Sequence, residues 1–401
     1  MSEELSTYEK RGVSSEKSEV HAAITTMDKG LYPGAFCTIL PDVFDNDPTK
    51  CIIQHADGAG TKAGLAYLYW KLTGDLSVWK GIVRDSLFMN VDDAMCAGAM
   101  GPFVINMTVG RNKALIPGEV IKTLIEYCQF LCEWLTGIGI PCYYAGGETA
   151  DLGDLIRTIT VDNVITVKFQ RRDVIDASRI RPGGIIVGFS STGQATYENE
   201  PNSGMGSNGL TNARHDSLHP DYRVHTETYA PETLPGLIYC GEHWLGGPLS
   251  GDPRFTIAQA LLSPTRTYLP MVKKLFEELG RESIQGLIHC SGGGQTKIGK
   301  FGQPGNVYVK DKLFPTPPLF QFLQVARKLS WREMFSSYNC GHRLEAVVSS
   351  RSAVQLCIQI AAQFDIAAKE IGRVEEDQGV TLSRRVIIKQ GGTKESYDFK
   401  V

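Results

Sequence analysis

The sequence predicts an α/β protein built from two successive blocks. Short apolar runs alternate with helical patterns and glycine-containing turns in both halves of the chain. In the first half, residues 51–56 form an apolar run that ends in the polar turn 57–62, and a helical segment follows. In the second half, residues 183–191 form a comparable apolar run. Both halves therefore have the order strand, glycine-containing turn, helix.

The boundary between the blocks is expected in the charged segment 170–184, which ends in Pro182-Gly183-Gly184. Four hundred and one residues are enough for two or three domains. We expect an N-terminal domain over residues 1–176 and a C-terminal domain over residues 177–401.

Further elements are expected on either side of this boundary. In the first half they are a helix over 78–97, a strand over 102–109, a helix over 117–137, a strand with a glycine-rich turn over 141–150 and a β-branched strand over 158–169. In the second half they are an irregular insertion over 192–256, a helical region over 256–279 interrupted by Pro264, an amphipathic helix within 346–364 and a β-rich tail ending near 390.

The composition is that of an ordinary globular protein. Forty-one basic and 44 acidic side chains give a net charge of −3, which favours neither nucleic acid nor an anionic membrane as a partner. The ten cysteines form no CxxC pair and no zinc-site spacing. The start of the chain is polar, and no apolar run reaches about 18 residues. We expect a cytoplasmic protein.

Three glycine-containing turns follow apolar runs, at 57–62, 146–150 and 292–294. Glycines let backbone N–H groups approach a phosphate, and a neighbouring carboxylate can hold the accompanying magnesium ion. Asp57 and Glu148 would supply such carboxylates. Each turn taken singly favours the simpler interpretation, a tight turn whose acid caps a helix.

Three acids lie in the largely apolar segment 78–97. If that segment is helical, Asp85 and Asp92 share one face, with Asp93 beside them. The cluster would then face a metal ion or a basic side chain, or else it belongs to a solvated surface helix. His289 ends the apolar run before Gly292 and could transfer a proton, although the residue on its own more often indicates a hydrogen-bonded core histidine.

Two familiar nucleotide motifs are excluded. The GxGxxG match at 204–209 does not directly follow a strand, which argues against a dinucleotide-binding site. The 57–62 turn lacks the GxxxxGK[ST] pattern of a Walker-type ATPase.

Taken in order along the chain, these segments resemble the phosphoribosylformylglycinamidine cyclo-ligase (aminoimidazole ribonucleotide synthetase) family. Its wider superfamily includes selenophosphate synthetase and thiamine-monophosphate kinase. The matching runs are Ser6-Thr7-Tyr8 with Gly12-Val13, Asp57 to Lys62, Asp85 to Asp93 with Gly98-Ala99, Gly146 to Ala150, Ser207-Asn208-Gly209, Leu262 to Tyr268, His289 with Gly292-Gly293-Gly294, and Tyr338 to Gly341.

The resemblance implies a two-domain aminoimidazole ribonucleotide synthetase-like fold, whose N-terminal domains pair through a barrel-like interface in a homodimer. ATP would bind between the domains. By resemblance, the metal ligands for Mg²⁺ would be Asp57, Asp93 and Glu148, and the catalytic residues would be His289, Lys62 and Asp57. The ATP- and phosphate-binding residues would be Gly58, Gly60, Thr61, Lys62, Gly146, Gly147, Thr149, Asn208, Gly292, Gly293 and Gly294.

The implied activity is ATP-dependent ring closure of formylglycinamidine ribonucleotide to aminoimidazole ribonucleotide, with ADP and phosphate as the other products. One alternative is another ATP-dependent phosphotransfer enzyme of the superfamily, such as a small-molecule kinase. A selenophosphate synthetase would need a reactive cysteine, for which Cys37 in an apolar run is a poor candidate. A second alternative is a non-catalytic nucleotide-binding scaffold, which would need none of these polar residues.

The chain departs from the family pattern at four places. Its N-terminal glycine-rich stretch is reduced to residues 29–34. Gly206 replaces the histidine usual before Ser-Asn-Gly, and His342-Arg343-Leu344-Glu345 replaces small and apolar residues. The 192–256 insertion has no counterpart that the resemblance explains.

Overall fold

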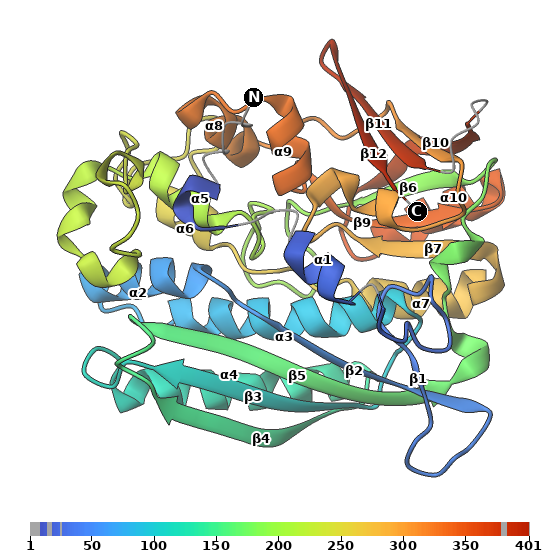
Figure 1. The fold of residues 1–401 in the computed structure, drawn as a ribbon, viewed down its shortest axis with the longest axis horizontal. Coiled ribbons are helices and arrows are strands. Elements are labelled where there is room, and N and C mark those ends of the chain that lie inside the picture. The colour runs from blue at the N-terminus through green and yellow to red at the C-terminus, as the bar shows by residue number, and fades with distance from the viewer. Residues whose placement is uncertain (1–8, 14–17, 25, 378–382, 401) are drawn as a thin grey trace.

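A computed structural model describes residues 9–13, 18–24, 26–377 and 383–400. Ser6-Thr7-Tyr8, part of the resemblance, lies outside these residues. The described chain forms two β-sheets with helices between and around them, which confirms the predicted α/β class (Figure 1).

The first sheet has five strands in the order β1-β2-β5-β3-β4. Only β3 and β4 run parallel; the other neighbours are antiparallel. Its strands are β1 (Leu40–Pro41), β2 (Lys50–Gly58), β3 (Phe103–Arg111), β4 (Cys142–Asp151) and β5 (Ile159–Gln170).

The second sheet has seven strands in the order β12-β11-β8-β10-β6-β9-β7. Only β8 and β11 run parallel in it. Its strands are β6 (Ile185–Ser190), β7 (Ile284–His289), β8 (Asn306–Lys310), β9 (His342–Val348), β10 (Ala368–Glu376), β11 (Arg384–Gln390) and β12 (Thr393–Phe399). The expected boundary at 176/177 falls between the sheets, and the division into two domains stays a prediction.

The helices pack around the sheets. They are α1 (Ser18–Ile24), α2 (Lys62–Thr73), α3 (Val78–Cys96), α4 (Gly118–Gly137), α5 (Leu210–Ser217), α6 (Ile257–Leu262), α7 (Leu269–Leu279), α8 (Pro318–Arg327), α9 (Trp331–Ser337) and α10 (Arg351–Ala362). Among the described residues, no helix combines the length and apolar character needed to span a lipid bilayer.

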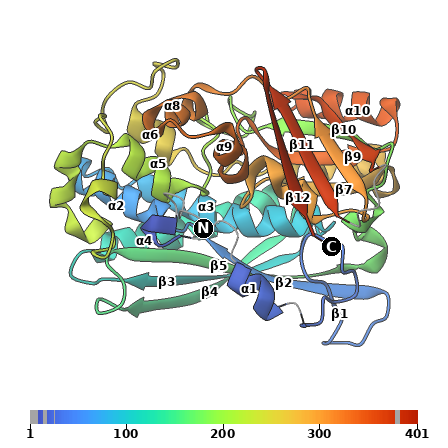
Figure 2. The same ribbon diagram turned by 45° about the horizontal axis from the view of Figure 1, so that its top comes forward.

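Helix α3 lies between the two sheets and touches both, against β2 and β5 on one side and β7 on the other (Figures 1 and 2). Fifteen of its 19 residues are buried, so the helix is enclosed nearly all round. Its three acids therefore lie inside the molecule and not on a solvated surface.

Two local predictions are wrong. Residues 145–150 form no glycine-rich turn, because β4 continues through them to Asp151. The expected helix over 346–364 starts only at Arg351, since Ala346–Val348 complete the buried strand β9. In both cases strand pairing overrides the local signal: Gly147 pairs with Met107, and Val347 pairs with Ile186.

The interruption of the 256–279 region is confirmed. Helix α6 ends before Ser263 and α7 begins at Leu269, with residues 263–268 in neither helix nor strand between them. The insertion 192–256 is largely irregular, as expected, and contributes α5 with several short 3₁₀ turns.

Candidate active site

The α3 carboxylates hold the 263–268 segment. Asp85 and Asp92 are both fully buried on one side of the helix. Asp85 Oδ1 accepts hydrogen bonds from the backbone N–H and the hydroxyl of Thr265, both at 2.7 Å. Asp92 accepts from the Thr267 hydroxyl at 2.6 Å and from the Tyr268 N–H at 3.0 Å. The predicted shared face is confirmed, and it anchors the segment that interrupts the helical region.

Asp85 also faces a basic side chain, one of the outcomes that the sequence predicts. Lys62 Nζ lies 2.8 Å from Asp85 Oδ2 and donates to the carbonyl oxygens of Ser263 at 2.6 Å and Gly206 at 3.0 Å. Burial lowers the pKa of Lys62, and the Asp85 carboxylate opposes this shift. The Lys62 ammonium thus contacts two carbonyl oxygens and one carboxylate inside the protein. A phosphate contact by Lys62 stays a prediction and would require it to exchange a partner.

Asp93 lies between two histidines. Its Oδ1 is 2.6 Å from His289 Nδ1 at the end of β7, and its Oδ2 is 3.6 Å from His55 Nε2 on β2. His55 is held in turn by Asn90, whose side-chain oxygen lies 2.9 Å from His55 Nδ1. The predicted pair of Asp93 and His289 is therefore brought together by a helix and a strand 196 residues apart in sequence.

This contact determines which nitrogen of His289 is available. With the Nδ1–H donated to the Asp93 carboxylate, the lone pair lies on Nε2. Nε2 is buried and has no hydrogen-bond partner among the described residues. The imidazole is thus arranged to accept a proton at Nε2.

Asp57 belongs to the same cluster. It lies near the end of β2, two residues beyond His55, so both side chains lie on one face of the strand. Burial raises the pKa of Asp57, and the nearby negative charge of Asp93 raises it further. Two neighbouring carboxylates that repel one another are a donor set that suits Mg²⁺, since a cation would relieve the repulsion. The residues present therefore fit the metal that the resemblance implies.

The glycine-containing turns at 57–62 and 292–294 meet the 206–211 segment. The Thr61 hydroxyl lies 2.9 Å from that of Thr211. A Cβ placed on Gly292 would lie 3.9 Å from Asn208 Nδ2. Most of the predicted phosphate-binding residues, namely Gly58, Gly60, Thr61, Asn208, Gly292, Gly293 and Gly294, thus lie around the Asp57–Asp93–His289 cluster. Their binding role stays a prediction.

The fourth predicted segment lies elsewhere. Gly146, Gly147, Glu148 and Thr149 are on the edge strand β4, with two strands between it and β2. Three inter-strand steps separate Glu148 from Asp57 by about 14 Å. Glu148 is exposed and pairs with Thr108, on the uncovered side of the sheet. Within one chain, the structure does not bring Glu148 together with Asp57 and Asp93.

The glycines of this segment have a structural explanation. The β3–β4 pairing shifts register between Ile105 and Met107, where Gly146 adopts φ +84°. A Cβ on Gly147 would lie 1.8 Å from the Met107 carbonyl oxygen. A bulge and a close backbone approach therefore account for both residues.

Sequence reasoning missed His55 and Asn90. His55 stands two positions before Asp57 in a predicted strand, and this period of two is the signal that could have identified it. Asn90 donates to the backbone oxygens of Asp57, Ser86 and Asn163 and so joins α3 to β2 and β5. No sequence signal marks Asn90, because its partners come from other elements.

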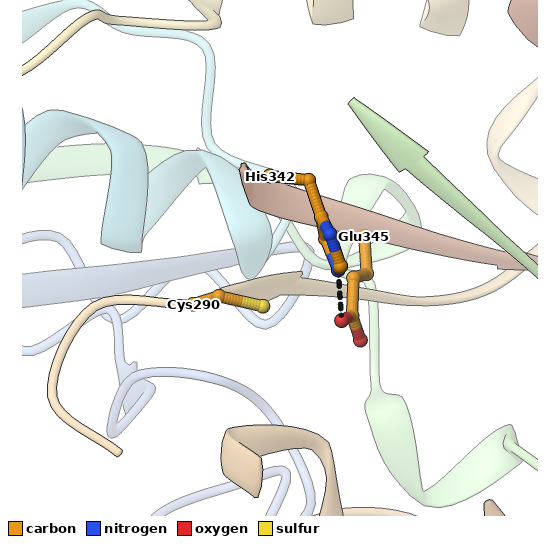
Figure 3. A group of neighbouring side chains, drawn as sticks. All are labelled: Cys290, His342 and Glu345. Atoms are coloured by element: carbon orange, nitrogen blue, oxygen red, sulfur yellow. Dashed lines mark hydrogen bonds and ion pairs between the residues drawn. The ribbon is translucent and has the colours of Figure 1, made fainter. Parts of the chain in front are cut away.

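A second buried polar cluster lies beside the site. Cys290, His342 and Glu345 have potential metal-ligand atoms within 4.8 Å of one another (Figure 3). His342 Nε2 contacts Glu345 Oε1 at 2.9 Å, and Lys310 forms an ion pair with the same carboxylate. Burial acts to raise the pKa of Glu345, but Lys310 and His342 outweigh it and hold that pKa at about 2. Because Lys310 already neutralises this carboxylate, we assign no metal to the cluster.

The fold of this chain is similar to that of several solved structures. The chain superposes with TM-score 0.55 on a chain of the HypE–HypF complex, at 13% identity, covering 96% of this chain and 99% of that one. It superposes with TM-score 0.51 on AaThiL complexed with AMPPCP and TMP, at 12% identity, covering 95% and 94%. A structure of tt0281 from Thermus thermophilus gives TM-score 0.51 at 12% identity, covering 93% and 96%. These likenesses establish the two-sheet fold.

Proteins related in sequence share one name, and they indicate a function more specifically than the structural neighbours do. The chain is 27% identical to a phosphoribosylformylglycinamidine cyclo-ligase of Alkaliphilus metalliredigens, covering 96% of this chain and 98% of that protein. A protein of the same name from Methanocaldococcus jannaschii is 27% identical over 84% of this chain and 81% of its own length. No family model matches the chain. The resemblance to phosphoribosylformylglycinamidine cyclo-ligases that the motifs indicate is confirmed.

Proposed function

We propose that this protein is an ATP-dependent cyclo-ligase that converts formylglycinamidine ribonucleotide to aminoimidazole ribonucleotide, ADP and phosphate in purine biosynthesis. The names of the relatives support the activity. The observation that carries the proposal is the convergence of Asp57, Asp93 and His289, with its unpartnered Nε2, beside two glycine-containing turns.

The chemistry explains why such a site is needed. An amide oxygen is a poor leaving group, so the γ-phosphoryl group of ATP is first transferred to it, which gives an iminophosphate. The neighbouring amidine nitrogen then attacks the activated carbon, the five-membered ring closes and phosphate departs. His289 Nε2 would take the proton that the attacking nitrogen loses, with Asp93 holding the imidazole in place. Transfer within a buried site also keeps water from the activated intermediate.

Asp57 and Asp93 would hold Mg²⁺, which neutralises phosphate charge when bound. The backbone N–H groups of the 58–61 and 292–294 turns would orient the phosphates, and Asn208 would assist them. Lys62, buried beside Gly206, would contribute positive charge at close range.

The testing experiment measures ADP release by the purified protein with ATP and Mg²⁺. We expect release that depends on formylglycinamidine ribonucleotide and yields one aminoimidazole ribonucleotide per ADP. ADP release with some other acceptor only would favour a small-molecule kinase of the superfamily. If the protein binds ATP but releases no ADP with any acceptor, the result would favour a non-catalytic nucleotide-binding scaffold.

One structural observation disfavours a selenophosphate synthetase. Cys37, the candidate thiol, is 6% exposed. Burial, and then the nearby Asp93 charge, raises the pKa of Cys37 well above its ordinary value. Such a thiol stays protonated and is a poor nucleophile.

A homodimer is part of the proposal. In the part of the chain that the structure describes, the side of the five-stranded sheet opposite α3 and α4 is uncovered and exposes Val104 at 40% and Tyr143 at 58%. An uncovered sheet face with apolar side chains suits association of two copies. Glu148 lies on this same face, so a metal ligand at this position would have to come from the partner chain. We further propose the domains 1–176 and 177–401 and a cytoplasmic location.

A further inference from the structure

Arg343 is a buried cation that forms no ion pair with any described carboxylate. It lies on β9 with 2% of its surface exposed, and its Nη2 donates to the carbonyl oxygen of Arg266 at 3.0 Å. Nε and Nη1 are buried and have no acceptor among the described residues, and no carboxylate there pairs with this side chain. Burying guanidinium N–H groups without hydrogen bonds costs free energy. We therefore expect the acceptor for these N–H groups to belong to a ligand that the free protein does not contain.

The neighbouring Arg266 shows the contrast. Its guanidinium forms an ion pair with Glu198 at 2.5 Å and donates to the carbonyl oxygens of Ser190, Thr192 and Gly193. The described residues therefore provide acceptors for all the guanidinium donors of Arg266, but not for all those of Arg343.

Gly206 makes room for Arg343. It adopts φ +66°, and a Cβ on it would lie 2.2 Å from Arg343 Nη1. Gly206 and Arg343 are two of the positions at which the chain departs from the family pattern. They are in direct contact, so an arginine from another strand occupies space that a side chain at position 206 would fill.

The contact lies at the edge of the candidate active site. The Gly206 carbonyl accepts from Lys62, and two residues further on Asn208 lies against the Gly292 turn. Leu344, next to Arg343, pairs with His289. Arg343 and Lys62 are thus two cations at one turn, and the Lys62 ammonium already contacts two carbonyl oxygens and the Asp85 carboxylate.

We propose that Arg343 binds a phosphate group of a substrate through its unengaged N–H groups, with Gly206 providing the clearance. The inference rests on the proposed function for its substrates. A phosphate monoester or phosphoanhydride matches a guanidinium in charge and in acceptor number. Two sources carry that chemistry, the 5′-phosphate of the ribonucleotide and the phosphates of ATP.

The experiment compares binding of ribose 5-phosphate and of the ATP analogue AMPPCP with Mg²⁺, by calorimetry on the full chain. The variants are Arg343→Met, Arg343→Lys and Gly206→Ala, and the last would push the guanidinium aside. Arg384→Met is the matched control, since Arg384 Nε also has no hydrogen-bond partner in the described part of the chain but lies on β11. We expect Arg343→Met to weaken one ligand at least tenfold, Gly206→Ala to weaken the same ligand, and Arg343→Lys to restore part of the affinity.

The weakened ligand identifies the source of the phosphate. Unchanged dissociation constants for both ligands in Arg343→Met, or equal losses in Arg384→Met, would show that Arg343 is only structural. If Arg343→Met fails to fold, Arg343→Lys and Gly206→Ala decide, and unchanged binding in both overturns the proposal. Because binding is measured without turnover, a protein that binds phosphate through Arg343 but releases no ADP would refute the cyclo-ligase activity alone.

Discussion

At the scale of single residues, the three acids of α3 have separate tasks although all are buried. Asp85 neutralises Lys62, Asp92 accepts from uncharged donors, and Asp93 contacts two imidazoles. Burial raises the pKa of Asp92 to about 6, since its partners are too weak to offset desolvation. Each carboxylate therefore has its own substitution test.

Asp93→Asn should lower kcat by about 100-fold or more, with little change in folding. The asparagine amide can donate to His289 Nδ1, which would move the ring proton to Nε2 and remove the acceptor there. Steady-state kinetics over a Mg²⁺ titration check this. Full recovery at high Mg²⁺ would show that Asp93 acts only as a metal ligand, and His289→Ala at near-wild-type turnover would remove the histidine from the mechanism.

Lys62→Met should destabilise the protein by about 3–5 kcal/mol, because it leaves the Asp85 charge buried and unpaired. Adding Asp85→Asn should recover most of that loss, as measured by urea unfolding. If Lys62 also contacts phosphate, the double variant will be stable but will bind ATP at least tenfold more weakly. Wild-type ATP affinity in the stable double variant would limit Lys62 to a structural role.

At the scale of elements, the insertion depends on a histidine kept neutral. His215 on α5 is 2% exposed, and its Nδ1 accepts a hydrogen bond from the Tyr239 N–H at 3.2 Å. Burial lowers the pKa of His215 to about 2, and Arg214 and Arg11 act in the same direction. Protonation would place two donors against each other, so α5 and the 239–240 segment are coupled to pH.

The pKa shift of His215 determines how the free energy of unfolding changes with pH. The folded-state pKa of His215 lies below its unfolded value of about 6.5, so this contribution to stability is complete above pH 6.5 and decreases as the pH falls. Between pH 7.5 and 5.5 the wild type should lose about 1.4 kcal/mol more than His215→Asn, whose side-chain oxygen can accept from Tyr239 without titrating. Urea unfolding at both pH values checks this. The same difference in His219→Asn, a partly exposed histidine, would contradict the assignment.

At the scale of the whole molecule, α3 separates the two sheets and supplies both the core and the site. One side of the five-stranded sheet is covered by α3 and α4, and the other is left open by the residues that the structure describes. The open face, and not the enclosed one, is where a second copy would bind.

Tyr143→Glu should convert a dimer of roughly twice 44.0 kDa into a monomer, because it replaces an exposed aromatic side chain of the open face with a charge. Light scattering after size exclusion measures the mass. Val224→Glu, at a 75% exposed apolar residue of the insertion, is the control and should stay dimeric. A wild-type mass of 44.0 kDa would contradict the dimer.

Several local features of this structure could be predicted from the sequence. The 78–97 pattern predicted α3 within one residue, and the spacing of Asp85 and Asp92 predicted their shared face. Pro264 predicted the break between α6 and α7. These features are local, since helical period and a missing N–H act within a few residues.

Contacts between distant segments needed the tertiary structure. The fold brings His289 into contact with Asp93 and Lys62 into contact with Asp85. It also places Glu148 on the opposite side of the sheet and packs Arg343 against Gly206. The sequence by itself determined which chemical groups this protein carries and the elements that bear them, because those depend on short-range periodicity. Which groups meet was decided by sheet order and by burial of α3, and these arise from packing between segments far apart in the chain, which no local pattern encodes.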